Sequence, residues 1–405
     1  MRLARRWPLL HAGQIVLSVI LAVALFSGAG WALSDVTLYY QWTGQILDAQ
    51  VPYRDFFFDY PPLSLPALMA PRVLSAFGDV TYGTYLVLFA ASMVGLSIAL
   101  FQVVRGIVRR LMSIPAADHA LKRHMLLMAL SVPVLLIRYD LWPILLVALA
   151  FLSTLDRRPV LAGAWLGIGI AAKLYPLTLM PLFAAYWLFS HGWRTALQHV
   201  TSVLVVTIGV LLPFLLLSEG AIGDMLQFQQ QRGLQVETAA GGVIQLLGLL
   251  APEDLAVVHT GTYELVSDRV SAYQAIQPII AVAALGLATV FGAYRVRDAV
   301  VGGRGPLSLA SVATAVLIVF VLTNRALSPQ HVFWCLSFAA LLPGYRYVAL
   351  LGIIGLTLAI FPLLYEQLLA QEVLPILVLN LRNGLFAILA VALLTRPIGP
   401  AASEP

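Results

Sequence analysis

The chain has 405 residues, of which 60% are hydrophobic and only 11% are charged, and its mean hydropathy is +0.90. This composition excludes an ordinary water-soluble globular protein and indicates a polytopic membrane protein. The net charge of +5 reflects basic loops between apolar runs and gives no evidence for nucleic-acid binding. The single cysteine, Cys335, excludes an intrachain disulfide and a metal site built on thiolates.

The apolar runs predict the number of membrane crossings. A transmembrane helix needs about 20 apolar residues, and about twelve runs are candidates, several of them short enough to be tilted, broken or buried in protein. They cover residues 10–31, 84–104, 124–137, 141–155, 159–173, 174–190, 196–217, 274–294, 306–323, 331–343, 347–364 and 373–394. We therefore predict an all-α polytopic integral membrane protein forming one transmembrane domain over residues 1–405.

Basic residues predict the orientation, because loops on the cytoplasmic side carry an excess of Lys and Arg. If the spans alternate in direction, every strongly basic loop falls on the same side as the N-terminus. These loops contain Arg2, Arg5, Arg6, Arg105, Arg109, Arg110, Lys122, Arg123, Arg157, Arg158, Arg194, Arg295, Arg297, Arg304, Arg346 and Arg396. Both termini then lie on the cytoplasmic side, and the membrane is expected to be the plasma (inner) membrane. The remaining interruptions, rich in acids, amides and aromatics, lie at the outer face.

The first long outer segment spans residues 34–82. Ser34 is a candidate N-cap, which places Asp35 in the first helical turn, where the helix dipole favours a carboxylate. Asp35, Tyr39 and Trp42 follow helical spacing and share one face. This pattern predicts an amphipathic helix at the membrane surface. Asp35 is a candidate catalytic residue, although it could equally serve as a helix cap.

A stretch dense in aromatics and carboxylates, VPYRDFFFDYPPL, follows this helix. Arg54, Asp55, Asp59 and Tyr60 are candidate substrate-binding residues within it. The charged residues could instead form a solvated cluster of ion pairs on a loop. The second long outer segment, residues 218–273, contains the apolar run GGVIQLLGLL and the candidate Arg232. Arg232 and Glu237 could be ordinary loop charges.

Charged and polar groups also occur between closely spaced apolar runs, where ionisable residues are rare and usually functional. Arg138 and Asp140 flank a tight turn, in which they could simply neutralise each other. Lys173, which precedes Tyr175, could snorkel to the lipid headgroups. The interruption after residue 323 holds a further group of candidates: Asn324, Arg325, Ser328, Gln330 and His331.

A carboxylate, several cations and many aromatics beside the lipid phase suit one kind of chemistry. A base must take a proton from an acceptor hydroxyl that attacks the anomeric carbon of a lipid-linked sugar. The departing lipid phosphate needs cations nearby, and aromatic faces suit the sugar ring. The absence of a Gly-rich phosphate loop from the sequence agrees with a donor taken from the membrane.

The chain resembles the GT-C glycosyltransferases that use polyprenyl-phosphate mannose, both the bacterial α-mannosyltransferases of glycosyltransferase family 87 and the catalytic subunit of GPI mannosyltransferase I. The resemblance runs in order through SDVTLYYQW with VPYRDFFFDYPPL, RYDLWP, AKLYPLTLMP, FQQQRGLQVET and NRALSPQHVFW. It implies a GT-C fold and an inverting transfer of a sugar from polyprenyl phosphate, with mannose as the first candidate sugar. The acceptor would be a glycolipid or cell-envelope glycan.

The resemblance also implies residue roles. Asp35 aligns with the acid of the first loop and would be the general base. Lys173, Arg325 and His331 would face the donor phosphate or sugar, while Arg138 and Asp140 shape the same cavity. The GPI enzyme has a D-x-D pair here, whereas this chain has Thr37 as the second member. A hard cation prefers several carboxylate oxygens, so we predict activity without a cofactor and without a divalent metal, or at most with a metal carried by the substrate phosphate.

Two other functions remain open from the sequence. A secondary transporter or flippase of lipid-linked sugars would also have many spans and intramembrane charges, although transporters usually place polar groups near the midplane between repeated halves. A non-catalytic subunit of an envelope assembly complex would not need Asp35.

Overall fold

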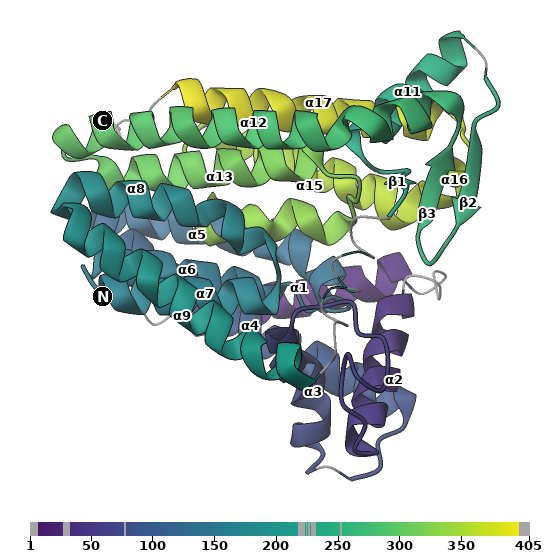
Figure 1. The fold of residues 1–405 in the computed structure, drawn as a ribbon, viewed down its shortest axis with the longest axis horizontal. Helices are drawn as coiled ribbons and strands as arrows, with labels where there is room; N and C mark the ends of the chain where they lie inside the picture. Colours follow the sequence, from purple (N-terminus) through teal and green to yellow (C-terminus); the bar gives the residue numbers. More distant parts are fainter. Residues whose placement is uncertain are drawn as a thin grey trace. The chain divides into compact units, whose positions relative to one another are not determined.

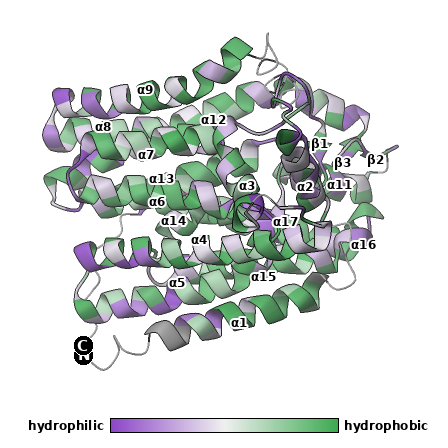
Figure 2. Cartoon of the chain, turned by 90° about the horizontal axis from the view of Figure 1, so that it is seen from below, coloured by the Kyte–Doolittle hydropathy of each residue, from purple (hydrophilic) through white to green (hydrophobic). Residues whose placement is uncertain are grey.

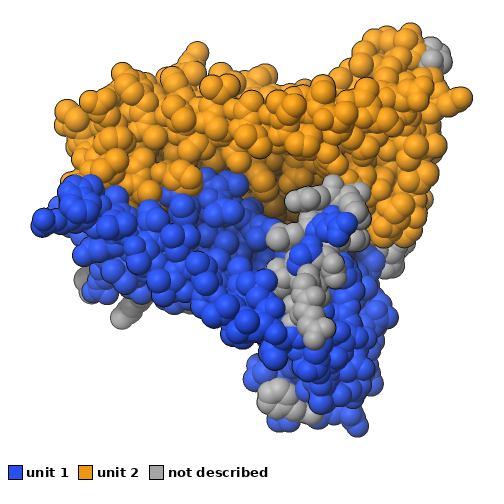
Figure 3. Space-filling view, in the orientation of Figure 1, with its two compact units in different colours: residues 1–180, 193–230 blue, residues 181–192, 231–405 orange. Residues whose placement is uncertain are grey.

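The structure, a computed structural model, describes residues 7–26, 33–76, 78–217, 223, 225, 227, 232–251 and 253–396. The chain forms two compact units, shown in Figure 3. Unit 1 comprises Met1–Met180 and Trp193–Gln230, and unit 2 comprises Pro181–Gly192 and Gln231–Pro405. Each unit is described separately below. The prediction of a single domain over the whole chain stays a prediction.

Unit 1 is built from helices. In chain order they are α1 (Trp7–Phe26), α2 (Ser34–Leu47), the 3-10 turn η2 (Pro62–Ser64), α3 (Leu65–Leu74), α4 (Tyr82–Leu111), α5 (Ile114–Leu135), α6 (Leu141–Leu155), α7 (Pro159–Ala172), the 3-10 turn η3 (Tyr175–Leu179) and α9 (Trp193–Leu217). The helices α4, α5, α6, α7 and α9 lie side by side (Figure 1).

Close packing of α7 on α9 depends on two glycines four residues apart. A Cβ atom at Gly163 would lie 2.5 Å from the carbonyl oxygen of His199, and one at Gly167 would lie 2.8 Å from that of Val203. Small residues at this spacing let two helix backbones approach in a membrane. This contact helps to fix the C-terminal end of α7, where Lys173 begins the next segment.

Unit 2 is also mainly helical. It contains nearly all of α8 (Met180–His191), then α11 (Ala239–Leu250), α12 (Asp268–Val301), α13 (Gly305–Thr323), the 3-10 segment η4 (Pro329–Cys335), α14 (Leu336–Ala339), α15 (Tyr345–Leu358), the π-helical turn η5 (Ala359–Leu363), α16 (Tyr365–Leu369) and α17 (Val373–Thr395). Side-chain caps begin α11 and α12, because Thr238 accepts from Gly241 N and Ser267 accepts from Val270 N.

A small sheet in unit 2 was not predicted. Its strands are β1 (Leu234–Gln235), β2 (Ala256–His259) and β3 (Tyr263–Val266), in the antiparallel order β1-β3-β2. Leu234 pairs with Leu265, and Val257 pairs with the same residue from the other side. Residues 234–266 therefore contain a β-hairpin extended by β1 as well as the helix over GGVIQLLGLL.

Within the described residues, six helical stretches are long and apolar enough to cross a membrane: α4, α9, α12, α13, residues Tyr345–Leu363 and α17. In the same part of the chain, four shorter apolar helices cover His11–Leu25, Leu141–Leu155, Pro159–Ala172 and Ala239–Leu250. Figure 2 shows the helices mostly in the hydrophobic colour. These features indicate a membrane-embedded, largely helical protein. The figure of about twelve crossings stays a prediction.

The structure corrects several element boundaries. Residues 331–343 form η4 and the four-residue α14 rather than one span, and residues 174–190 combine a 3-10 turn with α8. Pro329 and Pro176 lie at the starts of these 3-10 segments, where their missing N–H groups are tolerated. The predicted cap at Ser34 is also wrong: the helix begins with Ser34 itself, and Leu33 occupies the cap position without a side-chain bond.

Candidate active site

The amphipathic helix α2 presents Asp35 to the end of α5. Tyr39 and Trp42, on the same face, are buried, and Tyr39 packs against Phe89 of α4 with ring centroids 5.4 Å apart. This buried face anchors the helix. Asp35 Oδ2 lies 2.9 Å from Arg138 Nε, and the side chains of Asp35 and Arg138 are 24% and 8% exposed. The carboxylate is thus paired and still accessible.

The turn between α5 and α6 supplies two charged side chains to two different partners. Arg138 also donates from Nη1 to the Ile137 carbonyl at 3.0 Å. Asp140 accepts from Lys173 Nζ at 2.7 Å, and the Asp140 side chain is only 1% exposed. Arg138 and Asp140 therefore do not simply neutralise each other within the turn. Each forms an ion pair with a residue from a segment distant in sequence.

Three tyrosines join the two ion pairs. The ring centroid of Tyr60 lies 4.9 Å from that of Tyr139 and 6.1 Å from that of Tyr39. Lys173 Nζ lies 4.7 Å from the centroid of Tyr139 and 5.8 Å from that of Tyr60, within range of a cation–π interaction. Burial raises the pKa of the Tyr39 and Tyr60 hydroxyls well above 10.0, so these phenols stay protonated and can donate hydrogen bonds.

The other candidates in unit 1 differ in their surroundings. Tyr175 is buried, and Asp59 is half-buried, close enough to Tyr60 to contribute to the raised pKa of that hydroxyl. Arg54 and Asp55 form an ion pair at 2.8 Å with side chains 50% and 32% exposed. This pair has the solvated character that was one of the two interpretations from the sequence.

Charged side chains lie near both ends of α6, and the residues at the two ends differ. Arg110, at the end of α4, pairs with Asp156, just after α6, at 2.7 Å. Arg157 and Arg158 follow at the same place in the chain. The Asp35–Arg138 and Asp140–Lys173 pairs lie at the opposite end of α6, whose 15 residues span about 22 Å.

The polar segment after α13 belongs to unit 2. Arg325 donates from Nε to Gln277 Oε1 at 2.8 Å and from Nη2 to the Gln274 carbonyl at 2.9 Å. These two hydrogen bonds help to orient the guanidinium. Asn324 Oδ1 accepts from Ala326 N at 3.2 Å.

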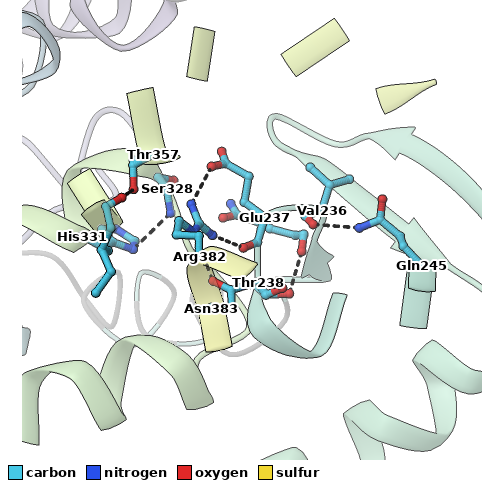
Figure 4. Close-up of polar contacts among 11 residues, drawn as sticks. Val236, Glu237, Thr238, Gln245, Ser328, His331, Thr357, Arg382 and Asn383 are labelled. Carbon is cyan, nitrogen blue, oxygen red and sulfur yellow. Dashed lines mark hydrogen bonds and ion pairs between the residues drawn. The ribbon is translucent and has the colours of Figure 1, made fainter. Parts of the chain in front are cut away.

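His331 and Ser328 form a reciprocal cap at the start of η4 (Figure 4). Ser328 N donates to His331 Nδ1 at 3.2 Å, and the imidazole packs on Trp334 with centroids 4.4 Å apart. Gln330 is buried, and Arg232 is half-buried in the coil before β1. That these residues meet Asp35 and Lys173 in one pocket stays a prediction.

A buried network in unit 2 was missed from the sequence (Figure 4). Arg382 of α17 is fully buried; its Nη1 lies 3.4 Å from Glu237 Oε2, and its Nη2 donates to the Glu237 carbonyl at 2.6 Å. Arg382 Nε donates to Asn383 Oδ1 at 3.1 Å, and Asn383 reaches the Thr238 carbonyl. The interpretation of Glu237 as an ordinary loop charge is wrong. An arginine inside an apolar run was the available signal.

Thr37, which replaces the second acid of the D-x-D pattern, has a local role. Its hydroxyl lies 3.3 Å from the Leu33 carbonyl and 3.2 Å from the Tyr82 hydroxyl. Among the residues that the structure describes, no group of three or more His, Cys, Asp and Glu side chains is arranged to hold a metal ion.

Comparison with known proteins gives one result at the level of the family. No curated protein matches the chain. The model of glycosyltransferase family 87 matches residues 56–323, about two thirds of the chain. The match includes Arg138, Asp140 and Lys173, whereas Asp35 precedes it and Arg325 and His331 follow it. The chain therefore belongs to glycosyltransferase family 87.

Proposed function

We propose that this glycosyltransferase moves a sugar, with mannose as the first candidate, from a polyprenyl phosphate to a hydroxyl of a glycolipid or cell-envelope glycan at the outer face of the inner membrane. One observation carries the proposal: Asp35, an accessible carboxylate, is held by Arg138 beside the Asp140–Lys173 pair. This group lies at the end of α6 remote from Arg110, Arg157 and Arg158. Since basic residues favour the cytoplasmic side, that separation supports an outer site.

The proposed reaction is a direct displacement. Asp35 takes the proton of the acceptor hydroxyl while its oxygen forms a bond to the anomeric carbon. The bond from that carbon to the phosphate oxygen breaks, and polyprenyl phosphate leaves with the electron pair. Attack from the face opposite the phosphate inverts the anomeric configuration, so a β-linked donor gives an α-linked product.

The neighbouring side chains have distinct proposed roles. Arg138 orients the carboxylate through Oδ2, and the buried ring of Tyr39 holds α2 against Phe89. The protonated phenol of Tyr60 offers a hydrogen bond to a sugar oxygen. Lys173 would stabilise the charge on the departing phosphate. The family resemblance alone assigns the same role to Arg325 and His331. Lys173 is shared with Asp140, and two hydrogen bonds help to orient the Arg325 guanidinium.

The test is transfer by purified protein in lipid nanodiscs, with polyprenyl-phosphate [14C]mannose as donor and glycolipids extracted from cells that lack the protein as acceptor. We expect labelled acceptor and free polyprenyl phosphate in equal amounts, and an α anomer by NMR. Addition of EDTA should leave the rate unchanged.

Two parallel reactions make this test decisive. GDP-mannose in place of the lipid-linked donor should give no product, because transfer is proposed to start in the membrane. Movement of intact donor across liposomes without cleavage of its glycosyl bond would support a flippase and contradict the proposal.

A further inference from the structure

A cavity of about 540 Å³ lies beside α2, away from the candidate base. Its helical wall is formed by Gln41, Gly44, Gln45 and Asp48, a spacing of three and four residues that defines one helix face. Asp35 and Tyr39 occupy a largely opposite face, because each helical residue is turned by about 100°, while Tyr40 and Trp42 also line the cavity. We call this space the α2 cavity.

A buried arginine from α3 closes one side of the α2 cavity. Arg72 donates to the Tyr40 carbonyl at 3.2 Å and to Thr43 Oγ1 at 3.3 Å. Its guanidinium lies 4.8 Å from the ring centroid of Tyr40 and 5.5 Å from that of Tyr85. Rings and hydrogen bonds fix this cation in place, so the cavity wall is preorganised.

The remaining wall is aromatic and partly exposed. Phe56 and Phe57 line the cavity, and Phe57 is 50% exposed. An exposed aromatic ring facing a group of amides, a carboxylate and a fixed guanidinium provides an apolar face together with several hydrogen-bonding groups. Small-molecule sites of ~300–1,000 Å³ commonly combine these features.

The lining selects among ligands by chemistry. A lipid tail would leave the amides of Gln41 and Gln45 and the carboxylate of Asp48 without partners, which is costly. Asp48 and Arg72 bring one negative and one positive charge to the lining, so a phosphate gains no net electrostatic attraction there. A neutral polyhydroxyl ring satisfies both requirements, because its hydroxyls can donate to Asp48 and its C–H face can lie on an aromatic ring.

We propose that the α2 cavity binds a neutral sugar unit of the acceptor glycan, separate from the unit that carries the reacting hydroxyl. This inference rests on the proposed function. The width of a helix, about 10 Å with its side chains, separates the two faces of α2, so a glycan must be several units long to reach both. The α2 cavity therefore selects for chain length of the acceptor.

The experiment uses the full-length protein in nanodiscs and two probes, mannobiose and mannohexaose. Gly44→Leu directs a side chain into the cavity, since a Cβ atom there meets only Arg72 Nη2 within 4 Å, at 3.7 Å. Gly209→Leu is the matched control, because Gly209 in α9 has nothing within 4 Å of the added Cβ. Gln41→Ala with Gln45→Ala removes the amides without adding volume.

Calorimetric titration without donor should show mannohexaose binding at least tenfold more weakly to both cavity variants than to the wild type and Gly209→Leu. The ratio of KM for mannohexaose to KM for mannobiose should rise by a similar factor. Equal binding by all four proteins, or displacement of mannohexaose by inorganic phosphate, would overturn the proposal. Binding that depends on the cavity in a protein without transfer activity would refute the proposed function and leave the sugar site standing. Transfer activity that does not depend on the cavity would refute the sugar site and leave the proposed function standing.

Discussion

Two of the ion pairs, Asp35–Arg138 and Glu237–Arg382, use similar residues in opposite surroundings. In unit 1, Asp35 pairs with Arg138 and its side chain is 24% exposed. In unit 2, Glu237 pairs with Arg382, and these side chains are 4% and 0% exposed. Arg382 also bonds the backbone of Glu237 and the side chain of Asn383. A charge in an apolar protein therefore does not distinguish a site from an anchor, whereas access to the carboxylate does.

The largest expected effect is on the accessible pair. Asp35→Asn keeps the shape of the side chain and removes the base, so kcat should fall by about 10²–10⁴-fold. The unfolding temperature should fall less than in Glu237→Gln, because the Asp35 carboxylate is 24% exposed. The transfer assay and thermal unfolding in detergent measure the two quantities. Asp156→Asn, in the exposed pair with Arg110, is the control and should keep full turnover. A normal kcat in Asp35→Asn would show that Asp35 is not the base, and would contradict the contrast between the Asp35–Arg138 and Glu237–Arg382 pairs.

Disrupting the enclosed Glu237–Arg382 pair should lower the stability of the protein. Glu237→Gln leaves Arg382 buried without a countercharge, a loss that typically costs about 3–5 kcal/mol. We expect a markedly lower unfolding temperature and an unchanged kcat for the fraction that remains folded. Combining it with Arg382→Met should recover much of the loss, because replacing both charges removes the unpaired group. A lower kcat at unchanged stability would instead assign this pair to the site.

The Asp140–Lys173 pair lies between the two extremes. Asp140 is enclosed and Lys173 is 13% exposed, so Lys173→Met should cost about 1.5–3 kcal/mol, the usual value of a hydrogen bond to a charged group. Asp140→Asn with Lys173→Met should restore the unfolding temperature but still raise KM for the polyprenyl-phosphate donor. If the double variant recovered both quantities, Lys173 would be only an anchor.

The smallest expected effect concerns the solvated pair. The Arg54 hydrogen bond, with a second from Val51 N, lowers the pKa of Asp55 from 3.8 to about 2. A depressed pKa stabilises the folded state above pH 3.8, and that contribution is lost only as the pH falls toward 2. Asp55 is thus fully ionised between pH 5 and 8, and unfolding temperatures over this range should change in parallel for Asp55→Asn and the wild type. A divergence would show that Asp55 titrates there.

Local features of the site were predictable from the sequence. The spacing of Asp35, Tyr39 and Trp42 predicted the helix and its buried face, because a helical period repeats over short distances. The break between two apolar runs likewise predicted the turn at Arg138 and Asp140. The cap at Ser34 was misplaced by one residue, since the start of a helix depends on backbone angles that neighbouring segments also influence.

The sequence by itself determined that this is a membrane-embedded, mainly helical protein of glycosyltransferase family 87, because long apolar runs and ordered motifs are written along the chain. Only the tertiary structure decided which charges meet: Arg138 with Asp35, Asp140 with Lys173, and Glu237 with Arg382. It also decided that Glu237 is enclosed while Asp35 is accessible. Partners separated by tens of residues are brought together by helix packing, and packing depends on the whole set of contacts rather than on any local pattern.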